Sequence, residues 1–249
     1  IDFYGKKVVV TSRFNDSGDT RFIKKTIIKG QGDEPTVTFA SNEGLSSALI
    51  GFTISGGEGS IGGGVFCSMA SPLLKNLIIK ENQSEKGGGI GLYSSDPQIQ
   101  DVKIIENRGM WSGGLYLTGY SSPIINNALI VKNTTFVNGG SIYVEEYSNP
   151  VFNNVTISDN GFPKKVPSWI KKYFGEIDPM MVNGIHISNG SNVVFNSSII
   201  IGDADSEVYF GEYGESSSLT ISYSNLDGGR SSVIDNYKRG TIHWMEGNI

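Results

Sequence analysis

Apolar and polar positions alternate in short runs along most of the chain. In four successive blocks that begin at a proline, the second, fifth and seventh positions after the proline are apolar, and the positions around them are mostly polar. Such alternation is typical of short strands with one buried face. We therefore expect these side chains to form a core: Leu74, Leu77 and Ile79; Ile99, Val102 and Ile104; Ile125, Ala128 and Ile130; Phe152, Val155 and Ile157.

A second alternating segment follows a glycine pair in each block. A block of about 25 residues thus holds two or three short strands separated by corners. We expect the first and third positions of this segment to point inward and the second position to point outward. The expected inward residues are Val65, Cys67, Ile90, Leu92, Leu115, Leu117, Ile142 and Val144, and the expected outward residues are Phe66, Gly91, Tyr116 and Tyr143.

The blocks repeat with a regular period. Asn82, Asn107, Asn133 and Asn160 lie 25, 26 and 27 residues apart, and the prolines keep step with them. A period in this range predicts a solenoid in which each turn packs only on its neighbours, with equivalent strands paired in parallel. The asparagines should then form a row that hydrogen-bonds along the axis. Weaker copies on both sides predict about eight or nine coils in one all-β domain spanning residues 1–249.

Two segments interrupt the repeat. Residues 11–25 read as a polar loop in the first coil. A longer insertion covers about residues 161–181, because Ile142 and Ile185 lie 43 residues apart instead of one period. Within it, Ser168 is a suitable N-cap for a short helix ending at Phe174.

The blocks resemble the right-handed parallel β-helix proteins of the pectin-lyase-like superfamily, especially repeat regions of large secreted or surface bacterial proteins. The resemblance implies that fold, an extracellular or cell-surface location, and a chain excised from something longer. Because this scaffold carries lyases, hydrolases and adhesins, it does not fix the activity. The residues that carry the resemblance are Gly88-Gly89-Ile90, Gly113-Gly114-Leu115-Tyr116, Ser122-Pro123 with Asn133, and the segments 1–7, 51–57, 223–229 and 246–249.

Composition narrows the classes of partner. The net charge of −5 and the lack of a basic stripe argue against nucleic acid. No run of about 20 apolar residues is present, so we expect no membrane span. The only cysteine, Cys67, occupies an inward position and is expected to be buried.

One outward column is a candidate binding surface. It contains Phe66, Tyr116, Tyr143, His186 and Tyr209, with Tyr93 in the neighbouring column. Aromatic rings one strand apart form a strip on which sugar rings can stack, and their hydroxyls can bond sugar hydroxyls. The alternative is that the rings only stabilise the sheet as cross-strand pairs.

A candidate catalytic group lies beside this column. Glu145 should lie diagonally from His186, and Lys171 of the insertion can overhang both, so the three suit acid–base work of a polysaccharide lyase or glycoside hydrolase. The alternative is a solvated ion pair. A glycosidase needs two spaced carboxylates, and no outward aspartate pair repeats on adjacent coils.

Two further segments carry candidate sites. Trp169 and Tyr173 of the insertion, next to lysines, can act as a clamp or partner anchor, or can simply cover the solenoid. Asp203, Asp205 and Glu207 alternate in a way that can bind calcium. The segment lacks the glycine-rich calcium repeat, so we expect no cofactor.

Taken together, these features favour a non-catalytic extracellular or surface module. Its lateral face would bind a polysaccharide or a surface protein, in adhesion or as a structural unit. The competing class is an enzyme acting on polysaccharide. Because neither end of the repeat has an evident cap, end-to-end self-association is also expected.

Overall fold

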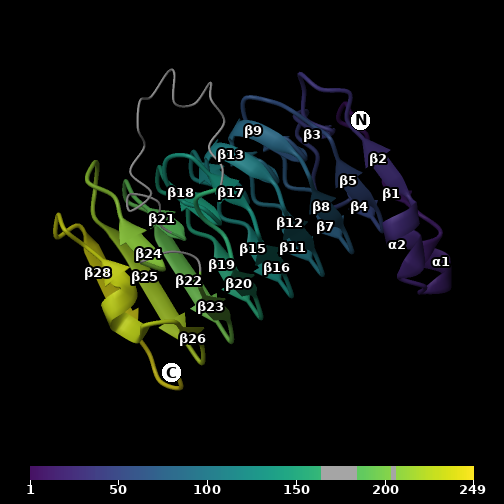
Figure 1. The fold of residues 1–249 in the computed structure, drawn as a ribbon. Coiled ribbons are helices and arrows are strands. Elements are labelled where there is room, and N and C mark those ends of the chain that lie inside the picture. Colours follow the sequence, from purple (N-terminus) through teal and green to yellow (C-terminus); the bar gives the residue numbers. More distant parts are fainter. Residues whose placement is uncertain (164–183, 203–205) are drawn as a thin grey trace.

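The computed structural model describes residues 1–163, 184–202 and 206–249 and shows a parallel β-solenoid of about eight turns (Figure 1). Each turn passes through sheets A, B and C in that order. Sheet A contains β3 (Val37–Phe39), β6 (Val65–Ser68), β10 (Ile90–Tyr93), β14 (Leu115–Thr118), β18 (Ile142–Val144), β21 (Ile185–Ile187), β24 (Val208–Phe210) and β27 (Val233–Ile234).

The other two long sheets form the remaining sides of the coil. Sheet B contains β1 (Val9–Thr11), β4 (Ala48–Ile50), β7 (Leu73–Lys75), β11 (Gln98–Gln100), β15 (Ile124–Asn126), β19 (Val151–Asn153), β22 (Asn192–Asn196), β25 (Ser217–Ser222) and β28 (Gly240–Trp244). Sheet C contains β2 (Ile27–Lys29), β5 (Thr53–Ser55), β8 (Ile78–Lys80), β12 (Lys103–Ile105), β16 (Leu129–Val131), β20 (Thr156–Ser158), β23 (Ile199–Ile201) and β26 (Asn225–Leu226).

A short fourth sheet, sheet D, follows sheet C in three turns. It consists of β9 (Gln83–Lys86), β13 (Arg108–Trp111) and β17 (Thr134–Thr135). The prediction of a parallel solenoid is confirmed, and the register agrees with the repeat. Ile142 pairs with Ile185 in adjacent strands, so the residues inserted between them add no turn.

The core lies inside the coil and consists of the predicted inward columns. Both inward positions of β6, β10, β14 and β18 are completely buried. Phe152 stacks on Phe195 of the next turn with ring centroids 4.6 Å apart. At the N-terminal end, Phe3 stacks on Phe39 at 4.1 Å, so this residue covers part of the first turns.

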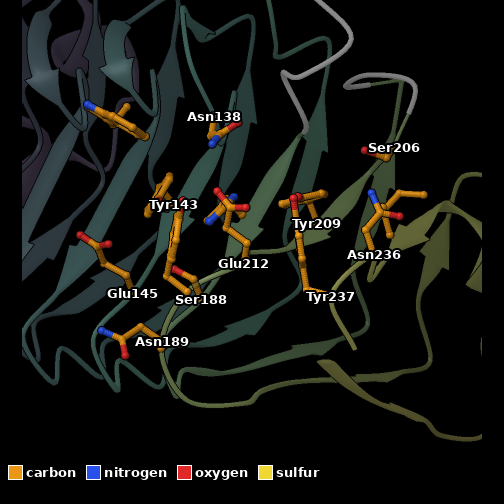
Figure 2. A pocket seen from close by; sticks show the side chains of 16 residues that line it. Asn138, Tyr143, Glu145, Ser188, Asn189, Ser206, Tyr209, Glu212, Asn236 and Tyr237 are labelled. Carbon is orange, nitrogen blue, oxygen red and sulfur yellow. The ribbon is translucent and has the colours of Figure 1, made fainter. Parts of the chain in front are cut away.

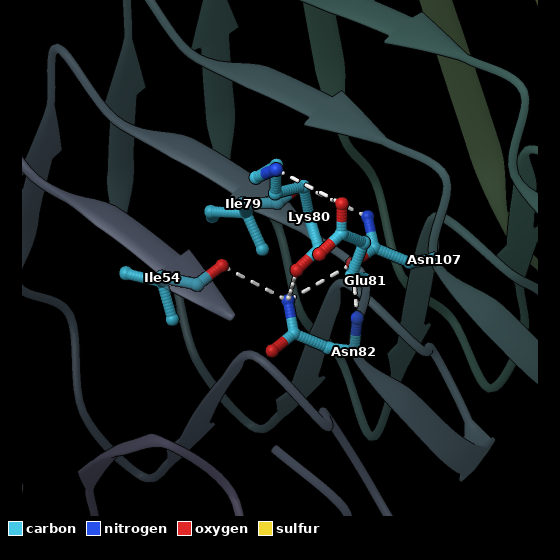
Figure 3. A network of polar contacts seen from close by, with 6 residues as sticks. All are labelled: Ile54, Ile79, Lys80, Glu81, Asn82 and Asn107. Atoms are coloured by element: carbon cyan, nitrogen blue, oxygen red, sulfur yellow. Dashed lines mark hydrogen bonds and ion pairs between the residues drawn. The ribbon is translucent and has the colours of Figure 1, made fainter. Parts of the chain in front are cut away.

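A buried row of asparagine amides runs along the axis, as predicted. Asn107 Oδ1 accepts hydrogen bonds from the backbone N–H of Asn82 at 3.1 Å and from its Nδ2 at 2.9 Å (Figure 3). Asn107 Nδ2 in turn donates to the Ile79 carbonyl and to Asn133 Oδ1, both at 3.0 Å. Asn133 and Asn160 repeat the pattern. Each side chain therefore joins three successive turns.

Serine hydroxyls form a second row that we did not predict. Each hydroxyl accepts a hydrogen bond from a backbone N–H one turn away, at 3.1–3.2 Å. All of the serines are buried. The row contains Ser95, Ser121, Ser148, Ser191 and Ser217.

The glycine pairs allow neighbouring turns to approach closely, and they do not adopt unusual backbone angles. None of the paired glycines Gly63-Gly64, Gly88-Gly89 and Gly113-Gly114 has a positive φ. A Cβ on Gly89 would lie 2.7 Å from Ile104 Cγ2 and 2.8 Å from the Gly114 carbonyl oxygen. The positive angles occur one residue earlier, at Gly62, Gly87 and Ser112.

The two ends of the coil differ from its middle. The first-turn segment read as a polar loop contains two short helices, α1 (Phe14–Ser17) and α2 (Arg21–Lys25), with Ile23 buried against the coil. A 3₁₀ helix, η2 (Gly229–Ser232), lies near the other end. Val10 and Ile28 face the core but are only partly buried, and Trp244 is likewise partly buried. End-to-end association stays a prediction.

No helix among the described residues is long and apolar enough to cross a bilayer.

The asparagine row should contribute strongly to stability. Substituting Asn107→Ala removes four buried hydrogen bonds and leaves backbone groups unpaired, so the free energy of unfolding should fall by roughly 3 kcal/mol. The measurement is urea denaturation followed by circular dichroism. Asn192→Ala, which removes an exposed amide, is the control and should cost under about 1 kcal/mol. Equal losses for the two variants would contradict a special role for the buried row.

A methyl group should not fit at the glycine pairs. Gly89→Ala should lower the free energy of unfolding by about 1–3 kcal/mol because the new Cβ meets backbone and a packed isoleucine. Gly44→Ala is the matched control, since nothing lies within 4 Å of a Cβ there. Thermal unfolding of both variants checks this. A Gly89→Ala protein as stable as the control would show that the turns can separate at no cost.

Candidate functional site

The predicted outward column is stacked as expected but largely covered. The Tyr143 ring lies between those of Tyr116 (centroids 5.6 Å apart) and His186 (4.2 Å), and His186 is followed by Tyr209 at 5.5 Å. Tyr116, Tyr143 and His186 are only 2%, 8% and 4% exposed, so their faces are not open to a sugar. Trp111 of sheet D packs edge-on against Tyr143. These three rings are therefore largely covered, in part by Trp111 of sheet D, and ligand binding by the column stays a prediction.

Glu145 is engaged by a member of this column. Its carboxylate accepts a hydrogen bond from the Tyr116 hydroxyl, which also accepts one from Lys86 Nζ at 3.1 Å. Burial and the bond to Glu145 raise the pKa of Tyr116 well above its usual range. The next residue, Glu146, accepts a hydrogen bond from Thr118 Oγ1 at 2.7 Å. This arrangement holds the Glu145 carboxylate on the outer face of sheet A.

His186 is buried as a neutral imidazole. Its Nδ1 has no hydrogen-bond partner within the described part of the chain, and burial lowers its pKa to about 3. A Cβ on Gly211 would lie 2.7 Å from His186 Nε2, so the glycine makes room for the ring. Glu145 and His186 border the same pocket, but the Glu145 carboxylate is hydrogen-bonded to the Tyr116 hydroxyl. Their joint acid–base role stays a prediction.

The pocket beside this column has a volume of about 600 Å³ and lies on the outer face of sheet A, toward the C-terminal turns (Figure 2). Tyr143 and His186 belong to its wall on the sheet. Glu212 and Tyr213 come from the segment after β24, and Tyr237 comes from the loop between β27 and β28. Amide side chains complete the lining at Asn138, Asn189 and Asn236.

Glu212 links the tyrosines of the pocket. Hydrogen bonding with Glu212 is the main cause that raises the pKa of both Tyr213 and Tyr237. Burial, followed by the influence of Tyr237, raises the pKa of Tyr209 to about 12. These phenols thus stay protonated at neutral pH. They can donate hydrogen bonds while their rings remain neutral.

The loop that carries Tyr237 is held by its own backbone contacts. The Asp235 carboxylate accepts hydrogen bonds from the backbone N–H groups of Arg239 at 2.8 Å and Gly240 at 2.9 Å. The Arg239 guanidinium donates to the Gly214 carbonyl at the edge of the pocket. These contacts connect the β27–β28 loop to the segment after β24, and so hold together the two segments that bear Glu212 and Tyr237.

Exposed tyrosines lie along the corner that follows sheet A. Tyr93, Tyr120 and Tyr147 are 43%, 69% and 39% exposed and come from successive turns. Tyr120 and Tyr147 stack with centroids 5.3 Å apart and planes within 10°. Tyr213, which is 76% exposed, lies further along the same corner at the pocket. Sequence reasoning found only Tyr93 of this group. The sequence signal for Tyr120 and Tyr147 was their position directly before Ser121 and Ser148 of the serine row, which we had not recognised.

Some of the remaining predicted site residues lie outside the described part of the chain, and the others lie away from the pocket. Lys171, Trp169, Tyr173, Asp203 and Asp205 lie outside the described residues. Phe66 is partly exposed and lies at the level of Gly91 on sheet A, away from the pocket lining. Glu207 is buried. The described ranges contain no group of side chains able to hold a metal ion, and calcium binding stays a prediction.

A second groove, of about 690 Å³, runs along sheet D. It is lined by residues that include Arg108, Met110 and Phe136, and Trp111 borders both this groove and the pocket on sheet A. Sheet D therefore separates two concave surfaces on one side of the solenoid.

The repeating turns, the three parallel sheets and the lateral pocket define a parallel β-solenoid module with a concave surface on one long face. Residues 46–248 match the family described as the right-handed β-helix region, and the chain belongs to that family. The resemblance to the pectin-lyase-like superfamily is consistent with this membership. No curated protein and no solved structure matches the chain.

The buried imidazole predicts a pH dependence of stability. Folded His186 has a pKa of about 3, against 6.5 for an unperturbed histidine, so the unfolded chain takes up the proton first as the pH falls. The free energy of unfolding should therefore decrease between about pH 6.5 and pH 3. His186→Phe keeps an aromatic ring in the stack and should flatten this part of the curve.

The measurement is urea denaturation of the wild-type chain and of His186→Phe at a series of pH values. Nuclear magnetic resonance of the His186 imidazole provides a direct reading. A His186 titration midpoint near 6.5 would contradict burial of the ring as a neutral group.

Proposed function

We propose that this β-helix is a non-catalytic module, secreted or on the cell surface, whose outer face on sheet A binds a glycan. The observation that carries the proposal is the pocket of about 600 Å³ in which tyrosines and amides converge. Aromatic rings with polar tips supply both apolar faces and hydrogen bonds, and sugars need both. The secreted or surface location rests on the resemblance to secreted repeat proteins.

The exposed corner tyrosines support an extended ligand. Tyr93, Tyr120, Tyr147 and Tyr213 follow one another along the solenoid and lead to the pocket. Strands of adjacent turns lie about 4.8 Å apart, so these side chains cover a length comparable to several sugar units. A chain-like glycan that crosses the corner and places one unit in the pocket fits this layout. Such a ligand gains affinity from several weak contacts on a rigid surface.

A polysaccharide lyase or hydrolase is the second candidate. The observation in its favour is that two carboxylates, Glu145 and Glu212, border the same pocket. Against it, both accept hydrogen bonds from tyrosines, and Nδ1 of the neutral His186 imidazole has no partner among the described residues to orient it as a base. We therefore favour binding over bond cleavage.

Glycan binding should depend on the pocket tyrosines. Tyr237→Ala should weaken retention of the bound glycan about tenfold, because an aromatic contact worth about 1.5 kcal/mol is lost. A glycan array identifies the ligand, and calorimetry measures the affinity. Tyr4→Asn is the control: Tyr4 is 70% exposed at the other end, and asparagine tolerates its positive φ. An equal loss in both variants, or retention of no glycan, would refute the proposal.

The enzyme alternative has its own assay. Polysaccharides, including uronic acid polymers, are incubated with the protein and examined for unsaturated products and new reducing ends. We expect neither. If products form and Glu145→Gln or Glu212→Gln abolishes them, the module is an enzyme and the binding proposal is wrong.

A further inference from the structure

The described lining of the pocket on sheet A is acidic, although Lys86 outside it bonds the same tyrosine hydroxyl as Glu145. Its described lining residues include Glu145 and Glu212 and contain no lysine or arginine. Arg239 reaches the edge, but its guanidinium is bound to the Gly214 carbonyl. The single histidine of the lining, His186, is neutral. An anionic sugar such as a uronate would meet like charge in this pocket, and like charge at a binding surface is strongly unfavourable.

The aromatic groups reinforce the same preference. Tyr209, Tyr213 and Tyr237 lie around Glu212, and all three phenols keep their protons at neutral pH. The faces of neutral aromatic rings attract cations, and aromatic pockets are a common means of holding ammonium groups. Carboxylates beside such rings add charge-assisted hydrogen bonds to an N–H donor.

A third feature is an unsatisfied polar atom beside the pocket. His186 borders the pocket, is 4% exposed, and leaves Nδ1 without a partner among the described residues. A buried polar atom without a hydrogen bond carries a free-energy cost. The neutral imidazole adds no positive charge to the wall of the pocket. Acidic groups, neutral rings and an unsatisfied polar atom thus occur at one cavity.

From this combination we infer that the pocket takes a protonated amino sugar, so that the glycan of the proposed function carries free amines rather than carboxylates. This inference rests on the proposed function and narrows it. The ammonium group lies among the tyrosine rings and bonds Glu212 or Glu145, and the sugar ring packs on the exposed rings of Tyr213 and Tyr237. A neutral or acetylated sugar has the same ring but lacks the charge that the pocket is built to receive.

The test compares three oligosaccharides of equal length with the full chain. The probes are a fully deacetylated chitin oligosaccharide, its fully acetylated counterpart and an oligogalacturonide. Calorimetry is carried out in a mildly acidic buffer in which the sugar amines are protonated. We expect the deacetylated probe to bind at least about tenfold more tightly than either other probe, and more weakly as salt is added.

Variants locate the charge. Glu212→Gln keeps the size of the side chain and should weaken binding of the deacetylated probe about tenfold, with less than about threefold effect on the acetylated one. Glu145→Gln should act in the same direction. Glu246→Gln is the matched control, because Glu246 is also bonded to a tyrosine, Tyr223, at 2.9 Å but lies outside the pocket. Thermal unfolding of each variant verifies that the fold is retained.

The outcomes separate this inference from the proposed function. Equal or tighter binding of the acetylated or acidic probe would overturn the amine assignment while leaving glycan binding intact. Retention of no glycan on an array would refute both. If an oligolysine peptide binds more tightly than the deacetylated probe, and Glu212→Gln removes that binding, the cation comes from a protein and the sugar assignment is wrong.

Discussion

The central turns of the solenoid depend on buried amide groups that must find partners in the neighbouring turns. Asn82, Asn107 and Asn133 each donate forward along the axis and backward to a carbonyl of the preceding turn. An unpaired buried amide is costly, so each turn has to lie directly over the last. The glycine pairs follow from this constraint, because a Cβ on Gly64 or Gly89 would come within about 3 Å of the asparagine row. The asparagine bonds and the glycine pairs thus fix both the distance between turns and the packing inside the coil.

The same regularity gives the outer face its character. Stacking equivalent residues places Tyr116, Tyr143 and His186 in one column, where each ring covers the next. The column is a rigid, uncharged wall, since burial keeps its phenols protonated and its imidazole neutral. The polar side chains that differ from turn to turn come from segments outside the repeat. Glu212 follows β24, and Tyr237 lies in a loop fixed by Asp235. The rigid turns thus support the pocket, and the irregular connections carry the side chains proposed to recognise the ligand.

Much of the fold was readable from the sequence, because periodic residues report periodic contacts. The inward columns, the asparagine row and the register across the insertion all repeat at fixed positions and were predicted. The site was harder to predict from the sequence. Tyr143 looked exposed because its column points outward, but covering by Trp111 depends on a fourth sheet that alternation along one strand does not reveal. Glu212 and Tyr237 occur once each, in segments with no repeat to align. The serine row was missed because its residues carry no apolar signal.

The asparagine row also bears on how such a chain changes over evolutionary time. The inner members, Asn107 and Asn133, each accept from one asparagine and donate to the next, so the row has a direction but its bonding does not set a length. Duplicating or deleting a whole turn leaves each remaining amide satisfied. Gaining a fraction of a turn would break the row, whereas the longer spacing between Ile142 and Ile185 leaves these two residues paired in register. Lineages of this protein should therefore vary in steps of one turn, with other length differences confined to the corners.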